Sequence, residues 1–185
     1  MVTIPGPAVL WFTGLSGAGK STISAAVELE LRRRIVPTEY LDGDAVRAMS
    51  PTGFTRADRD AHVRRVGFLA SRLEHHGVTV VCALISPYAE ARRYVRSLCQ
   101  RFIEIYVSTP LEECERRDRK GLYARARRGE ITHFTGIDDP YESPVNPELR
   151  IDTTRMSVEE AVAMVMSVWA GEEAPAALAS STVRR

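Results

Sequence analysis

Residues 14–21 read GLSGAGKS, and this short stretch decides the fold. It follows an apolar run, AVLWFT at 8–13, whose length and composition are typical of a buried strand. It precedes the segment 20–34, where apolar residues recur at helical spacing. A glycine-rich loop between a strand and a helix allows backbone N–H groups to surround a phosphate. The pattern therefore predicts a Walker A loop and a nucleoside triphosphate site.

The residue types of this loop have separate expected tasks. Its glycines let the backbone curl around phosphate oxygens, Lys20 is expected to contact the terminal phosphates, and the Ser21 hydroxyl is expected to bind Mg²⁺. Only Lys20 and Lys120 are lysines among the 25 basic residues, which favours a specific need for an ammonium group. The alternative is a glycine-rich turn with no ligand. The predicted nucleotide site comprises Gly14, Leu15, Ser16, Gly17, Ala18, Gly19, Lys20, Ser21 and Thr22.

The rest of the chain alternates between predicted strands and helices. Apolar runs predict strands at 78–84 and 102–107, with weaker candidates at 36–41 and 148–151. Helices are predicted over 20–34, 57–76, 88–100, 111–128 and 157–170. This alternation predicts an α/β protein with the three-layer P-loop NTPase fold: a mainly parallel five-stranded sheet, helices on both faces, and a lid.

The length of 185 residues suits one domain, which we place at 1–171. The segment 172–185 has no amphipathic face and is expected to be a disordered tail. The segment 129–147 is rich in Gly, Pro and Asp, so it is expected to be a long loop of the kind that forms functional lids.

Composition argues against several classes of protein. A content of 44% hydrophobic and 26% charged residues is typical of a folded globular chain. The net charge of +1 argues against a surface adapted to nucleic acid or to an anionic membrane. The sequence shows neither an apolar run long enough for a membrane span nor a signal peptide, so we expect a cytoplasmic protein. The three cysteines form no CxxC pair, which argues against a zinc site.

Two carboxylates follow the predicted second strand in LDGDAVR, residues 41–47. At the end of a strand beside the phosphate loop, Asp42 and Asp44 could order Mg²⁺-bound water or accept a proton from an attacking hydroxyl. The alternative for either residue is a helix cap.

Three further segments carry charged, polar or aromatic side chains. GFTRADRDAHVRR, residues 53–65, could present arginines to an anionic acceptor or form a solvated helix face. In ISPY, residues 85–88, Ser86 either lies at the ligand-binding edge of the sheet or caps a helix. The segment 116–138 predicts a basic helix bearing Arg117, Asp118, Lys120 and Tyr123, followed by Phe134 in a loop. It is interpreted as a lid, with a mobile basic loop as the alternative.

Taken in order, the motifs of the chain resemble those of the adenylylsulfate (APS) kinase family. They are GLSGAGKST, LDGDxVR, GFTxxDR, ISPY, PLEECERRD, KGLYARARRGEI and FTGIDDPYESP. The resemblance implies ATP-dependent phosphorylation of the ribose 3′-hydroxyl of APS, giving PAPS and ADP in sulfate activation. It also implies ATP and Mg²⁺ as ligands, a homodimer, and functional coupling to ATP sulfurylase.

The resemblance also implies roles for individual residues. Lys20, Asp44 and Lys120 would be catalytic, with Asp44 as the proton acceptor, and Mg²⁺ would be held by Ser21 and, through water, by Asp42. Near the ATP base would lie Arg117 and Met156. The APS site would comprise Asp44, Arg47, Phe54, Arg59, His62, Ile85, Ser86, Lys120, His133 and Phe134, with the two phenylalanines around the adenine. Direct in-line transfer is expected, without a phosphorylated Ser86.

Three positions depart from the family pattern. His62 and Ala45 stand where asparagine is usual, and His133 stands where a glycine is usual. These changes bear on recognition of the acceptor more than on phosphoryl transfer. Two alternatives therefore stay open: a kinase of the same fold acting on another nucleotide or a sugar, and a regulatory or scaffolding partner, for example of ATP sulfurylase, that binds nucleotide without turnover.

Overall fold

The computed structural model describes residues 5–49 and 53–172, and the predicted tail beyond these lies outside the described residues. All five predicted strands are confirmed: β1 (Val9–Thr13), β2 (Thr38–Asp42), β3 (Thr79–Ala83), β4 (Phe102–Val107) and β5 (Leu149–Ile151). They form one parallel sheet in the order β2-β3-β1-β4-β5. Every residue of β1 and β3 is buried, because both faces of the sheet are covered, and this is why both strands appear in the sequence as continuous apolar runs.

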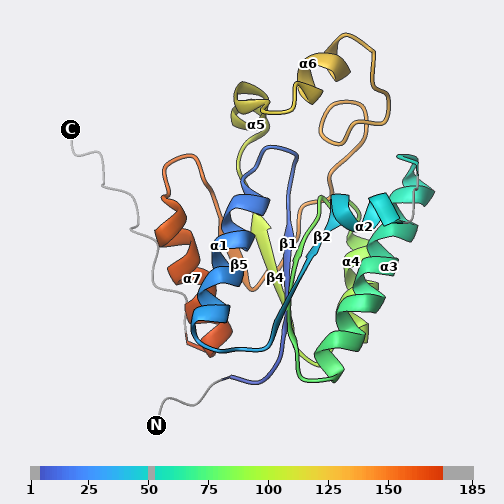
Figure 1. Ribbon diagram of the computed structural model, residues 1–185. Coiled ribbons are helices and arrows are strands. Elements are labelled where there is room, and N and C mark those ends of the chain that lie inside the picture. Colours follow the sequence, from blue (N-terminus) through green and yellow to red (C-terminus); the bar gives the residue numbers. More distant parts are fainter. Residues whose placement is uncertain (1–4, 50–52, 173–185) are drawn as a thin grey trace, which may run out of the picture.

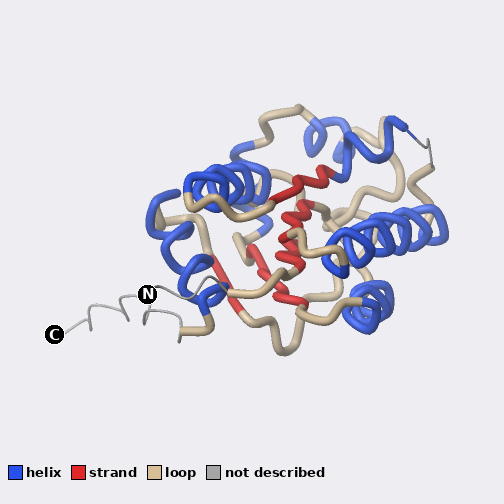
Figure 2. The backbone as a smooth tube through the Cα atoms, turned by 60° about the horizontal axis from the view of Figure 1, so that its bottom comes forward, coloured by secondary structure: helices blue, strands red, loops and turns tan. Residues whose placement is uncertain are grey.

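Four long helices cover the two faces of the sheet (Figures 1 and 2). On one face lie α1 (Lys20–Arg33) and α7 (Val158–Ala170), and on the other lie α3 (Arg56–His75) and α4 (Ala89–Leu98). Each pair has its own apolar core: Leu31 and Trp169 belong to the first, and Val66 and Val95 to the second. The predicted three-layer α/β architecture is confirmed.

Three short helices lie near the carboxyl ends of the strands: α2 (Gly43–Met49), α5 (Leu111–Arg117) and α6 (Leu122–Arg127). The prediction of one continuous helix over 111–128 is wrong, because the chain breaks between α5 and α6. Gly121 has φ of 64°, and the Asp118 carboxylate accepts the N–H groups of Tyr123 and Ala124, each at 3.0 Å. Lys120 therefore lies in a turn rather than on a helix.

Candidate active site

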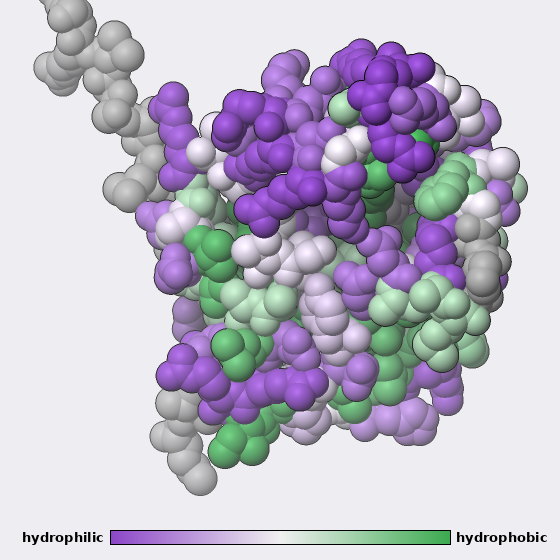
Figure 3. All heavy atoms as spheres, turned by 45° about the horizontal axis from the view of Figure 1, so that its top comes forward, coloured by the Kyte–Doolittle hydropathy of each residue, from purple (hydrophilic) through white to green (hydrophobic). Residues whose placement is uncertain are grey.

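A cavity of about 910 Å³ opens at the carboxyl edge of the sheet, between the phosphate loop, the start of α3 and the segment that contains α5 and α6. Figure 3 views the molecule from this side and shows hydrophilic side chains gathered over the upper part of the face. The lining includes most of the predicted site residues: Ser16, Gly17, Gly19, Lys20, Ser21, Thr22, Asp42, Asp44, Arg47, Phe54, Arg59, His62, Ile85, Ser86, Arg117, Lys120, Phe134 and Met156. Gly14, Leu15, Ala18 and His133 are predicted site residues outside this lining.

The phosphate loop connects β1 to α1 and depends on glycine at its two ends. Gly14 has φ of 148°, and a Cβ atom there would lie 2.4 Å from the carbonyl oxygen of Val107 on β4. Gly19 has φ of 105° and immediately precedes α1. Both positions require a backbone conformation that other residues rarely adopt, so the sequence pattern and the loop geometry agree.

Lys20 is folded back over the loop. Its Nζ atom donates to the carbonyl oxygens of Gly14, at 2.9 Å, and of Leu15, at 2.7 Å, and the residue is only 8% exposed. Burial lowers the pKa of Lys20 to about 8, although the nearby Asp44 opposes the shift. A phosphate group in the loop would favour the charged form of this lysine.

The two aspartates after β2 have different surroundings. Asp42 Oδ1 accepts the backbone N–H groups of Asp44, at 2.8 Å, and Ala45, at 3.0 Å, so the expected alternative of a helix cap is confirmed for Asp42. The Asp44 carboxylate is instead 79% exposed and pairs with Lys120. Since Asp42 also lines the cavity with Ser21, its capping contact is compatible with a place near a metal.

Two arginines flank the ring of Phe54, which directly precedes the capping box at the start of α3. The guanidinium carbons of Arg47 and Arg59 lie 4.9 and 5.5 Å from the ring centroid. Arg59 is buried and donates to the carbonyl oxygens of Phe54 and His133 at 3.0 and 2.7 Å, so the solvated-face alternative is wrong for this arginine. The cluster provides positive charge and an aromatic face at the same side of the cavity.

His62 also lines the cavity and is 4% exposed. Burial, together with the positive charges of Arg47 and Arg65, lowers the pKa of His62 to about 4. The imidazole is therefore neutral near pH 7. Within the part of the chain that the structure describes, its Nδ1 atom has no hydrogen-bond partner, which leaves one buried polar atom on a residue that lines the cavity.

The segment after α6 closes one wall of the cavity through Phe134. The Phe134 ring is 8% exposed and stands edge-on to Tyr123 at 5.0 Å, and the Tyr123 hydroxyl donates to the carbonyl oxygen of Ser16 in the phosphate loop at 2.8 Å. His133 does not match its predicted place, because its side chain is exposed and outside the lining. It has φ of 56°, and its backbone serves the turn through Asp138 and Arg59.

Ser86 is buried, with φ of 41°, in the turn after β3. Its hydroxyl accepts the Trp11 indole N–H at 3.1 Å and donates to Thr13 Oγ1 at 2.8 Å. The helix-cap alternative is wrong, because the residue at the N-cap of α4 is Tyr88. The Ser86 hydroxyl is therefore engaged in buried contacts with Trp11 and Thr13.

Comparison with known proteins identifies the family. The family described as adenylylsulphate kinase matches residues 6–152. The chain belongs to the adenylylsulphate kinase family. It is 53% identical over 159 residues to the adenylyl-sulfate kinase of Synechococcus sp. (strain JA-3-3Ab), covering 85% of this chain and 90% of that relative. The predicted family and fold are thus confirmed.

Solved structures of the family superpose on this kinase. The Mycobacterium tuberculosis APS kinase in complex with AMPPNP and APS has a TM-score of 0.84 and 44% identity, with 89% of this chain and 98% of that chain covered. A hexameric APS kinase from Thiobacillus denitrificans has a TM-score of 0.68 and 36% identity, with 88% of this chain but 28% of that chain covered. A gluconokinase from Sinorhizobium meliloti, at 18% identity and a TM-score of 0.56, shares the fold alone.

In this member of the adenylylsulphate kinase family, three hydrogen bonds at the site were not predicted from the sequence. Arg117 donates to Thr153 Oγ1 at 2.7 Å, and Thr153 Oγ1 donates to the carbonyl oxygen of Ala18 at 2.9 Å, so Arg117 supports the phosphate loop as well as lining the cavity. The Tyr123 hydroxyl bond to Ser16 was also missed, because it joins residues 107 positions apart. Only the position of Tyr123 in the motif KGLYARARRGEI could have drawn attention to it.

Proposed function

We propose that this kinase transfers the γ-phosphoryl group of MgATP to the ribose 3′-hydroxyl of APS, giving PAPS and ADP. The observation that carries the proposal is that one cavity is lined by the phosphate-loop lysine, Lys20, by an exposed carboxylate, Asp44, and by two arginines around an aromatic ring. Family membership supports the same reaction.

The nucleotide side of the cavity is the phosphate loop together with Arg117 and Met156, which are proposed to lie near the ATP base. Among the described residues no group of three or more His, Cys, Asp or Glu side chains could hold a metal. This fits Mg²⁺ that arrives with the nucleotide, because Mg²⁺ keeps water and phosphate oxygens as ligands and needs few protein groups. Ser21 and, through water, Asp42 would hold it, and it would neutralise charge on the phosphoryl group.

The acceptor side is proposed to bind APS through ring stacking and charge. Phe54 and Phe134 would enclose the adenine, while the guanidinium groups of Arg47 and Arg59 would attract the phosphosulfate. The acceptor pocket would be completed by His62, Ile85 and Ser86, all of which line the cavity. His133 acts on this pocket through the backbone of the turn that carries Phe134, since its own side chain is exposed.

The transfer step needs a proton acceptor and neutralisation of charge. In the proposed step, the O3′–Pγ bond forms, the bond from Pγ to the ADP oxygen breaks, and the 3′-hydroxyl proton moves to the Asp44 carboxylate. Lys20 stabilises the charge on the transferring oxygens, and Lys120 brings a second ammonium group from the turn between α5 and α6. Enclosure of the reactants excludes water as a competing acceptor.

The deciding experiment incubates the purified protein with MgATP and APS and measures PAPS and ADP by mass spectrometry. AMP and gluconate serve as alternative acceptors. They test the alternative that the protein is a kinase for another nucleotide or a sugar. We expect the protein to phosphorylate APS, giving PAPS, and to phosphorylate neither AMP nor gluconate. Folded protein that binds both substrates but forms no PAPS would support the nonenzymatic binding partner and overturn the proposal.

A homodimer, functional coupling to ATP sulfurylase and a cytoplasmic location are further proposals. None of the helices within 5–49 and 53–172 is long and apolar enough to cross a membrane. Size-exclusion chromatography with light scattering distinguishes a dimer from a monomer or hexamer. Coupling is tested by comparing PAPS formation from added APS with formation from APS made in place by ATP sulfurylase.

A further inference from the structure

Hydrogen bonds join the turn after β3 to residues 139–142 of the long loop. We call residues 85–89 the acceptor turn, because Ile85 and Ser86 line the cavity, and residues 139–142 the lid stem. The Glu142 N–H donates to the carbonyl oxygen of Pro87, and the Ala89 N–H donates to the Glu142 carboxylate, both at 2.8 Å. The Tyr88 hydroxyl donates to Asp139 Oδ2, also at 2.8 Å. The lid stem and the acceptor turn therefore form one packed unit.

One buried arginine joins the same two segments. Arg92 on α4 is 3% exposed and donates to the carbonyl oxygens of Ser86, at 2.6 Å, and Glu142, at 2.5 Å, while its Nε bonds to Glu104 at 2.8 Å. Ser86 has positive φ, a conformation that a non-glycine residue keeps only where its surroundings hold it. The shape of the acceptor turn thus depends on these contacts.

The Thr13 hydroxyl, at the end of β1, connects this unit to the sheet. Thr13 has a single hydroxyl proton, and it donates that proton to the carbonyl oxygen of Ile85 at 2.7 Å. Ser86 Oγ donates to Thr13 Oγ1 at 2.8 Å. The hydroxyl of Tyr141 lies 2.9 Å from the same oxygen, so Tyr141 must be the donor in that contact. Burial raises the pKa of Tyr141, which is consistent with a retained proton.

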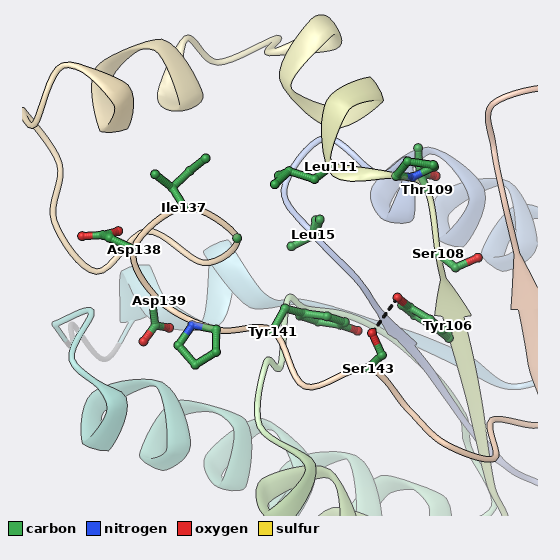
Figure 4. Close-up of a pocket in the computed structure, with 13 residues that line it drawn as sticks. Leu15, Tyr106, Ser108, Thr109, Leu111, Ile137, Asp138, Asp139, Tyr141 and Ser143 are labelled. Carbon is green, nitrogen blue, oxygen red and sulfur yellow. Dashed lines mark hydrogen bonds between the residues drawn. The ribbon is translucent and has the colours of Figure 1, made fainter.

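The ring of Tyr141 is held independently of its hydroxyl. It stacks on Tyr106, the β4 residue in register with Thr13, with centroids 5.8 Å apart. Figure 4 shows both rings beside a second hollow of about 600 Å³, and none of the described residues lines both this hollow and the active-site cavity. The Tyr106 hydroxyl bonds instead to Ser143 Oγ at 3.0 Å. Tyr141→Phe therefore removes the hydrogen bond to Thr13, whereas Tyr106→Phe removes the hydrogen bond to Ser143.

We propose that Tyr141 is a positioning residue for the acceptor. Its hydroxyl, acting through Thr13, fixes Ile85 and Ser86 against the end of β1 and so sets the geometry of the pocket that receives APS. This inference rests on the proposed function. The Gly14 N–H of the phosphate loop also lies 3.5 Å from the Ile85 carbonyl oxygen, but the loop has further support from Lys20 and from Thr153, so we expect the nucleotide side to depend less on the Tyr141 hydroxyl than the acceptor side does.

The test compares Tyr141→Phe with Tyr106→Phe, which removes a hydroxyl from the neighbouring ring. For Tyr141→Phe we expect the KM for APS to rise about fivefold to tenfold, the factor that corresponds to one lost buried hydrogen bond. The KM for MgATP should change by less than about twofold, and Tyr106→Phe should leave both constants within about twofold. Thr13→Val should raise the KM for APS at least as much as Tyr141→Phe, while Thr13→Ser, which keeps the hydroxyl, should restore it.

Other results would overturn the inference. Equal changes in the KM values for APS and MgATP, or a change in kcat with both KM values unaltered, would contradict a role in positioning the acceptor. A lowered melting temperature of the same variant would then assign the effect of the Tyr141 hydroxyl to stability. An unchanged KM for APS in Tyr141→Phe would show that the acceptor turn is positioned without it. A wild-type protein that forms no PAPS marks failure of the proposed function, whereas an active wild type with an unaffected variant marks failure of this inference alone.

Discussion

The ammonium group of Lys120 lies 2.9 Å from Asp44 Oδ2, although the two residues are 76 positions apart in the chain. Lys120 lies in the turn between α5 and α6, and Asp44 lies in the first turn of α2, so the pair spans the cavity. The hydrogen bond raises the pKa of Lys120, which keeps it charged. Both side chains are more than two-thirds exposed, so the pair adds little stability and is free to rearrange around a substrate.

Replacing Lys120 with alanine should therefore affect turnover rather than folding. We expect kcat/KM to fall by about tenfold or more, because a charge that stabilises the transferring phosphoryl group is lost. The melting temperature should stay near that of the wild type. Arg128→Ala is the matched control, since Arg128 is also an exposed basic residue beyond α5 but pairs with Glu130 and does not line the cavity. Equal losses in the two variants would argue against a specific role for Lys120.

The two aspartates after β2 should differ in their effect on stability. Asp44→Asn keeps the size of the side chain but removes the proton acceptor, so kcat should fall by about 10² to 10⁴ with little change in stability. Asp42→Ala removes the oxygen that caps α2 and should lower the free energy of unfolding by about 0.5–2 kcal/mol. Steady-state kinetics and urea denaturation of both variants provide the measurement. Near-normal turnover by folded Asp44→Asn would exclude Asp44 as the base.

The parts of this structure that could be predicted from the sequence depend on local chemistry or on the rule that the ends of parallel strands meet at one edge of the sheet. The strands β1 and β3 were predicted because burial on both faces makes them continuously apolar. Lys20 and Asp44 were placed together, with Ser86 at the same place as one of two alternatives, because the carboxyl ends of parallel strands meet at one edge. For the same reason, one cavity includes them all.

The missed parts depend on tertiary contacts between distant residues. Helical spacing continues through 111–128, but the Asp118 carboxylate caps a new helix and Tyr123 is bonded to the phosphate loop, so the chain breaks there. The hydrogen bond between Thr13 and Tyr141 joins residues 128 positions apart, and Tyr141 lies in a long loop without periodicity. No local pattern in the sequence specifies such a pairing.

His133 is expected to strain the turn that carries Phe134. Its φ of 56° lies in the left-handed region, where glycine has no steric cost. His133→Gly should therefore raise the free energy of unfolding by about 0.5–1 kcal/mol, measured by urea denaturation. His133→Ala is the control, because alanine keeps a Cβ atom and so should give no comparable gain. A gain of equal size in both variants would assign the effect to the imidazole rather than to the backbone.

The lowered pKa of Lys20 predicts how nucleotide binding depends on pH. In the free protein Lys20 begins to lose its proton near pH 8, and bound phosphates should favour its charged form. MgATP affinity should therefore weaken above about pH 8, and binding at that pH should take up a proton. Isothermal titration calorimetry in two buffers of different ionisation enthalpy measures the uptake. Lys20→Met is expected to abolish it, and equal uptake by this variant would assign the proton to another group.

The same shift has a defined sign for stability. Between pH 8 and the ordinary value of 10.5, the unfolded chain binds more protons at Lys20 than the folded chain does. The contribution of Lys20 to the free energy of unfolding must then rise with pH across that window. Below pH 8, the full energetic cost of burying the charged ammonium group is present. Denaturation of the wild type and Lys20→Met at pH 7.5 and pH 10 measures the difference. If the wild type gained no stability relative to the variant on going to pH 10, the burial of a charged Lys20 would not be the cause of its lowered pKa.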